Sequence, residues 1–120
     1  MNIEDFYHYC LSFPGTEEDF PFDENTLVFK VMGKMFALTN VDTFESINLK
    51  CDPVEALELR AAYHEIKPGY HMNKKHWNTV STKGSLQDDF IKDLVQHSYE
   101  LVVQNLPKKF KKKLKSLNNE

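Results

Sequence analysis

Residues 27–39, LVFKVMGKMFALT, decide the fold of this chain. Two short runs, 27–32 and 35–39, flank the Gly33-Lys34 pair, and both contain the apolar and aromatic residues that favour strands. Glycine in the first of two turn positions is typical of a two-residue hairpin. The stretch therefore predicts two antiparallel strands joined by a tight turn.

Three helices are predicted around this hairpin. Apolar residues recur at helical spacing over residues 3–11, and Asn2 stands where an N-cap belongs. The run Asp52–Glu55 begins a second helix, because it combines an N-cap aspartate, a proline at the first helical position and a glutamate at the third. A third apolar stripe, over 90–102, predicts a long helix that we expect Ser85 to cap.

Three more strands complete the predicted sheet, at 46–50, 65–70 and 77–82, while the acidic stretch 16–25 is predicted to be a loop. The resulting order is helix, three strands, helix, two strands, helix. Short antiparallel strands with helices on one side are the α+β arrangement. We therefore predict α-β(3)-α-β(2)-α, with helices packed on a five-stranded antiparallel sheet.

Charge divides the chain into an acidic part and a basic part. Residues 1–107, predicted to form one domain, carry 9 basic and 17 acidic side chains, whereas the Lys-rich tail 108–120 carries six lysines and one glutamate. The chain has 120 residues and 41% hydrophobic residues, which suits one hydrophobic core and excludes intrinsic disorder. A domain with net charge −8 is not built as a whole around a polyanion.

The sequence contains neither a secretion signal nor a membrane-spanning segment. Residues 1–13 include two carboxylates and no basic segment before an apolar run, and no apolar run approaches the roughly 18 residues that span a bilayer. Cys10 and Cys51 are more typical of two free thiols in a reducing compartment than of a disulfide. We expect a cytoplasmic protein that does not bind membranes.

The candidate binding face is residues 68–80, PGYHMNKKHWNTV. Aromatic rings, amides, imidazoles and ammonium groups crowd into this stretch, and together they could stack on bases and bind an anion. The equally weighted alternative is a solvated loop whose Tyr70 and Trp77 belong to the core or the sheet edge. The candidate nucleic-acid- or ligand-binding residues are Lys50, Tyr70, His71, Asn73, Lys74, Lys75, His76 and Trp77.

Catalytic and metal-binding patterns are weak. His71 and His76 are five residues apart, which is not the spacing of a helical zinc pair, and no further ligand lies close to them in sequence. Cys51 stands just before the predicted helix at Asp52, where a helix dipole could activate a thiol, but a packed and inert cysteine is the favoured interpretation. We expect no catalytic residues, no metal, no cofactor and no enzymatic activity.

The Lys-rich tail has apolar residues at helical spacing, Leu106, Phe110, Leu114 and Leu117. Its lysines could bind nucleic-acid phosphates or an anionic membrane surface. The alternative, which we favour, is a final helix that docks on the acidic body or frays in solvent.

Five stretches together resemble the MmcQ/YjbR family of small bacterial proteins: CLSFPGTEEDFPF, FKVMGKMFALTN, NLKCDP, PGYHMNKKHWNTV and HSYELVVQNLPKK. The resemblance covers residues 1–112 in order. It implies a five-stranded α-β(3)-α-β(2)-α fold akin to CyaY-like proteins and type III secretion chaperones, and a DNA-binding label. The expected partner is DNA, with a protein or peptide partner or a small ligand as the alternatives, and the expected state is a monomer or weak homodimer.

Overall fold

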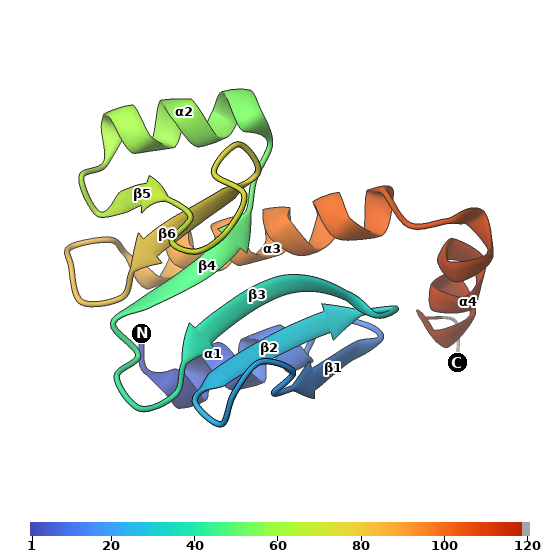
Figure 1. Cartoon of the computed structure of the whole chain (residues 1–120). Helices are drawn as coiled ribbons and strands as arrows, with labels where there is room; N and C mark the ends of the chain where they lie inside the picture. Colours follow the sequence, from blue (N-terminus) through green and yellow to red (C-terminus); the bar gives the residue numbers. More distant parts are fainter. Residues whose placement is uncertain (119–120) are drawn as a thin grey trace.

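The structure, a computed structural model, describes residues 1–118 (Figure 1), so residues 119–120 of the Lys-rich tail lie outside it. Its elements in chain order are α1 (Ile3–Leu11), β1 (Thr16–Asp19), β2 (Thr26–Val31), β3 (Lys34–Asn40), β4 (Ser46–Lys50), α2 (Pro53–Ala62), β5 (Ile66–Pro68), β6 (Trp77–Ser81), α3 (Asp88–Gln104) and α4 (Lys108–Asn118). The class is α+β, as predicted.

The sheet has six strands in the order β1-β2-β3-β4-β6-β5, and every neighbouring pair is antiparallel. The prediction of five strands is wrong because Thr16–Asp19, expected to be a loop, pairs with β2 as an edge strand. Charged side chains are well tolerated at an edge. Two of them also find partners, since Tyr7 Oη donates to Glu18 at 2.8 Å and Lys30 Nζ donates to Asp19 at 2.9 Å.

The central hairpin turns one residue earlier than predicted. Val31 pairs with Lys34, so Met32 and Gly33 occupy the turn, with φ of 49° and 80°. Two successive positive φ values are the mark of a type I′ turn, whose twist matches that of the strands. A register shift after Phe29 then places both Phe36 and Ala37 in the core, where each is fully buried.

The core lies between one face of the sheet and the helices. Phe6 of α1 and Ile91 of α3 are fully buried there against Phe29 and Ile47 of the sheet, and Leu59 of α2 packs at its border. A smaller cluster of Val28, Leu38 and Trp77, flanked by Met35 and Met72, is separate from this core. Strand alternation assigns that cluster to the opposite face.

Two of the three helix caps predicted from sequence are present in the structure, and one is not. The Asn2 and Asp52 side chains accept the backbone N–H of Asp5 and Glu55 at 2.8 and 3.1 Å, as the sequence predicts. Ser85 does not cap α3, which begins at Asp88. Its hydroxyl instead donates to the Glu65 carboxylate at 2.5 Å, a partner twenty residues away.

Within residues 1–118, no helix is both long and apolar enough to cross a bilayer.

Candidate functional site

The segment 69–76, here called the β5–β6 loop, is held by its own polar groups. Lys74 Nζ donates to the Gly69 carbonyl at 3.0 Å, and the Asn73 carboxamide accepts the Lys75 N–H at 2.9 Å. Gly69 N–H donates to the Trp77 carbonyl at 2.8 Å, closing the loop. A Cβ at Gly69 would lie 2.7 Å from that of Trp77, so the closure needs glycine. Much of the polar character of this loop is therefore used internally.

Arg60 of α2 fixes the base of this loop. Its Nε donates to the Asn78 side chain at 2.6 Å, and its guanidinium also donates to the carbonyls of Lys74 and Trp77. The fork of guanidinium donors suits such a role, because one side chain reaches three acceptors. The end of the loop is also bonded to the residue after β4, because the Cys51 N–H donates to the His76 carbonyl at 2.8 Å.

Trp77 is 8% exposed and packs with Val28 and Leu38, so its ring is not available to stack on a base. Of the two interpretations left open from sequence, packing of Trp77 holds and stacking does not, because β6 turns this side chain onto the sheet and Met72 packs against it. Lys50 is its cross-strand partner and is half-buried.

The other candidate binding residues of the loop differ in how exposed their side chains are. Tyr70 is 69% exposed, and its ring lies 4.0 Å from that of His71 between centroids. His71 adopts a positive φ of 59°, a conformation that non-glycine residues adopt infrequently. His76 is half-buried, while the exposed residues are Tyr70, His71, Asn73, Lys74 and Lys75. Figure 1 shows the loop between β5 and β6 passing in front of the sheet.

Helix α4 is the second cationic region. Leu106 and Leu114 are buried and join the core, and Phe110 is half-buried. Leu114 packs so tightly on the α1–β1 turn that a Cβ at Gly15 would lie 2.6 Å from its Cδ1. The tail is thus a docked helix, and its lysines, all exposed, are Lys108, Lys109, Lys111, Lys112, Lys113 and Lys115.

The α4 lysines are not neutralised by carboxylates of the described chain. None of the ion pairs among residues 1–118 includes one of them. The apolar stripe faces the core, so Lys108, Lys112 and Lys115 lie on the opposite side of the helix by its 3.6-residue period. Figure 1 shows α4 at one end of the molecule, beyond the tip of the β2–β3 hairpin.

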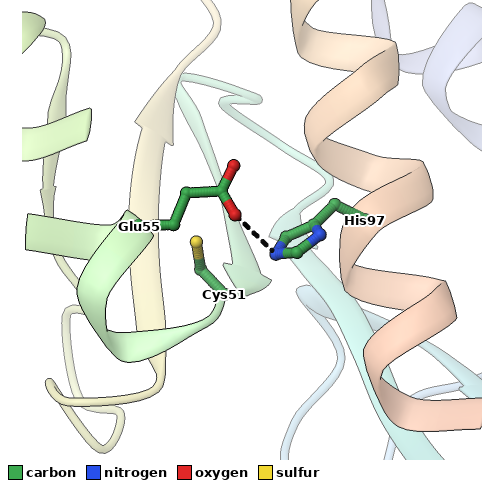
Figure 2. Close-up of side chains that lie close together, drawn as sticks. All are labelled: Cys51, Glu55 and His97. Atoms are coloured by element: carbon green, nitrogen blue, oxygen red, sulfur yellow. Dashed lines mark ion pairs between the residues drawn. The ribbon is translucent and has the colours of Figure 1, made fainter. Parts of the chain in front are cut away.

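A third group of side chains was not predicted. Ligand-type atoms of Cys51, Glu55 and His97 lie within 4.8 Å of one another, at the meeting point of the end of β4, the first turn of α2 and the middle of α3 (Figure 2). His97 Nε2 lies 3.3 Å from Glu55 Oε2. The group includes neither His71 nor His76. From sequence, only the proximity of Cys51 and Glu55 could be predicted, because they lie four residues apart. His97 is 46 positions from Cys51 and gives no such signal.

The Cys51 thiol is not an activated nucleophile. Burial, followed by the nearby Glu55 and Asp52 carboxylates, raises its pKa to about 11, and Arg60 offsets this only in part. The helix-dipole lowering considered from sequence is therefore outweighed by desolvation. Beside Cys51 and His97 is a cavity of about 10 Å³, which has room for about one water molecule and not for an organic ligand.

The family of the chain follows from a comparison with known proteins. The YjbR family model matches residues 11–101, which is most of the chain. The chain belongs to the YjbR family. The family resemblance inferred from sequence motifs is thereby confirmed.

Two curated relatives of this family cover nearly the whole chain. YjbR of Escherichia coli K12 is 36% identical over 118 residues, covering 98% of this chain and all of the relative. YbdF of Escherichia coli O157:H7 is 40% identical over 107 residues, covering 88% of each chain. Both are described as uncharacterised proteins, so family membership assigns no activity.

Solved structures share the fold. A crystal structure of a Deinococcus radiodurans protein matches with a TM-score of 0.88 at 39% identity, covering 94% of this chain and 87% of that chain. A crystal structure of a Pseudomonas syringae protein matches with a TM-score of 0.72 at 32% identity, covering 84% and 98%. The α+β fold with an antiparallel sheet is thus a property of related proteins as well.

Proposed function

We propose that this YjbR-family protein binds nucleic acid, DNA in particular, through the outward face of α4 and without a catalytic step. The observation that carries the proposal is a docked helix with six exposed lysines, none of them paired with a carboxylate of the described chain. Binding of phosphates by lysines on a fixed helix costs less conformational entropy than binding by lysines on a flexible tail, because the helix backbone is already ordered.

The β5–β6 loop supplies a second, smaller contact in this proposal. Lys75, Tyr70 and His71 are exposed and could meet a phosphate and an unstacked base. Lys74 contributes less, because its ammonium group already donates to the Gly69 carbonyl. Trp77 takes no part, since it is buried.

A nucleic acid fits α4 better than a membrane does. Helices that lie in a membrane interface insert their apolar face. The apolar face of α4 packs on the core, since its Leu114 is 4% exposed and Phe110 is half-buried, and Leu106 just before the helix is 5% exposed. A polyanion needs only the lysine face, which is free. Both cysteines are free thiols, which fits a reducing cytoplasm where nucleic acid is accessible.

The test measures binding to a short fluorescent DNA duplex, and to the matching single strand, at a series of salt concentrations. Fluorescence anisotropy reports the bound fraction. Each lysine that meets a phosphate adds about 0.9 to the slope of log K against log salt. Replacing Lys108 and Lys112 by Gln should therefore lower the slope by about 2. The matched control replaces Lys67 and Lys83, two exposed lysines of the body, and should leave the slope unchanged.

Absence of binding at about 50 mM salt, where phosphate contacts are strong, would contradict the proposal. So would equal losses in the α4 variant and the body variant, because the attraction would then not be located on α4.

A protein partner is the second candidate, favoured by one observation. Phe20 and Phe22, in the loop after the edge strand β1, are 45% and 64% exposed. Exposed aromatic rings beside a free strand edge are the features used when a partner adds a strand. Self-association that is insensitive to salt and is lost on replacing both Phe20 and Phe22 by Ser, measured by sedimentation, would favour this candidate.

A further inference from the structure

Three different ligand types converge in this protein from three separate elements. The Cys51 thiol comes from the end of β4, the Glu55 carboxylate from the first turn of α2 and the His97 imidazole from α3. Figure 2 shows the sulfur, the carboxylate and the ring nitrogen gathered around one space. Thiolate, imidazole and carboxylate are the three side-chain ligands that zinc uses in proteins.

The distances fit the edges of a zinc tetrahedron. Zinc–nitrogen and zinc–oxygen bonds of about 2.0–2.1 Å separate two such ligands by about 3.3 Å, and an edge to sulfur is about 3.6 Å. His97 Nε2 and Glu55 Oε2 are 3.3 Å apart, and all three ligand atoms fall within 4.8 Å. Small side-chain rotations at Cys51 or Glu55 would complete the geometry.

The orientation of His97 also favours a cation. His97 Nε2 accepts the Asp52 N–H at 3.5 Å, a long hydrogen bond, and the same nitrogen lies 3.3 Å from Glu55 Oε2, so a metal ion between them would take the lone pair in place of the weak Asp52 bond. A lone pair and a carboxylate oxygen 3.3 Å apart repel unless a proton or a metal ion lies between them. The Glu55 side chain is half exposed and that of His97 is 30% exposed, so an ion could enter from solvent.

We propose that Cys51 Sγ, a Glu55 carboxylate oxygen and His97 Nε2 bind one zinc ion, with water in the fourth position. Zinc replaces the thiol proton of Cys51, which is released to solvent. The site is separate from the lysine face of α4, so it does not depend on the proposed nucleic-acid binding.

Zinc at this position would tie α2 to the rest of the fold. Ala56 is the one fully buried residue that α2 contributes within the described chain, and Val54 and Leu57 are 66% and 65% exposed. The helix is therefore held by modest packing and by Arg60. A metal bridge from its first turn to α3 adds an attachment, which predicts that zinc raises the melting temperature and protects α2 from hydrogen exchange.

The experiment titrates Zn²⁺, and Co²⁺ as a spectroscopic substitute, into untagged protein freed of metal with a chelator. We expect one ion per chain by calorimetry, and a thiolate-to-cobalt charge-transfer band that shows the sulfur is bound. Cys51→Ser should abolish the band, and His97→Gln and Glu55→Gln should each weaken zinc binding by about tenfold or more. Glu55→Gln is the safest variant to interpret because the side chain is half exposed.

Three control variants remove the same residue types elsewhere: Cys10→Ala, Glu58→Gln on the exposed side of α2, and His8→Gln on α1. Each should keep the stoichiometry and the cobalt band. Circular dichroism of the metal-free variants establishes that they are folded.

The proposal is overturned if folded wild-type protein binds no zinc, or if binding and the cobalt band survive Cys51→Ser. It is equally overturned if Glu55→Gln lowers the melting temperature by the same amount with and without zinc, since Glu55 and His97 would then be a simple ion pair.

Discussion

The β5–β6 loop and helix α4 both carry lysines, but they are built in opposite ways. In the loop, Lys74 and Asn73 hold the chain to itself, and Arg60 ties it to α2. In α4, the buried Leu114 and the half-buried Phe110 hold the helix while every lysine stays exposed. A dense mixture of polar and aromatic residues thus turned out to be largely structural, whereas a plain lysine run presents free charge. What distinguishes α4 is exposed charge with no ion-pair partner in the described chain, which the more varied sequence of the loop does not offer at Lys74.

The largest expected effect contrasts two aromatic residues of the loop region, Trp77 and Tyr70, in their contribution to the free energy of unfolding. Trp77→Ala removes a buried indole and should lower the free energy of unfolding by about 4 kcal/mol. Tyr70→Ala, its matched control, removes a ring that is 69% exposed and should change it by less than about 0.5 kcal/mol. Urea denaturation measures both. Similar values for the two variants would contradict the division into a structural Trp77 and a free Tyr70.

The next largest effect is expected at the anchor of α4. Leu114→Ala leaves a cavity against Gly15 and should lower the free energy of unfolding by about 3 kcal/mol. Leu117→Ala on the same helix is the control, because Leu117 is 47% exposed. If both substitutions are harmless in urea denaturation, α4 is not docked and its lysines belong to a mobile tail.

Arg60→Ala tests whether the loop depends on α2. The substitution leaves the Asn78 side chain and the carbonyls of Lys74 and Trp77 without this donor, which should cost about 2 kcal/mol. Hydrogen exchange should accelerate at the Gly69 and Trp77 amides, whose hydrogen bonds close the loop. Unchanged exchange at these two amides would show that the loop holds itself without Arg60.

The smallest expected effect is on the stability of the α4 lysine variants. Replacing Lys108 and Lys112 by Gln removes exposed charges without ion pairs, so the free energy of unfolding should stay within about 0.5 kcal/mol of wild type. Thermal and urea denaturation check this. A larger loss would mean that these lysines serve the fold, as Lys74 does in the loop.

Much of the architecture could be predicted because it depends on neighbours in sequence. The Asn2 and Asp52 caps satisfy N–H groups three residues away, and the apolar period places Phe6 and Cys10 on the buried side of α1. The β2–β3 hairpin was found from its turn, although its centre is Met32-Gly33 and not Gly33-Lys34. Only the backbone shows that two positive φ values begin at Met32.

The candidate sites were harder to predict, because exposure and convergence are properties of the packed chain. Sequence left Trp77 open between a binding face and the core or sheet edge, and the Val28–Leu38 cluster buries it. Sequence weighed α4 as docked or frayed, and the fit of Leu114 on Gly15 decided for docking.

The sequence by itself determined the α+β class, the family, the helix caps and the division of charge between body and tail. The class, the caps and the charge division follow from periodicity, short-range hydrogen bonding and composition, all of which are local, and the family followed from the resemblance of five sequence motifs. Only the tertiary structure decided that Thr16–Asp19 is a strand, that Trp77 is buried and that Cys51, Glu55 and His97 meet. Each of these depends on a partner supplied by another part of the chain, across a sheet edge or between helices, and no local pattern encodes that proximity.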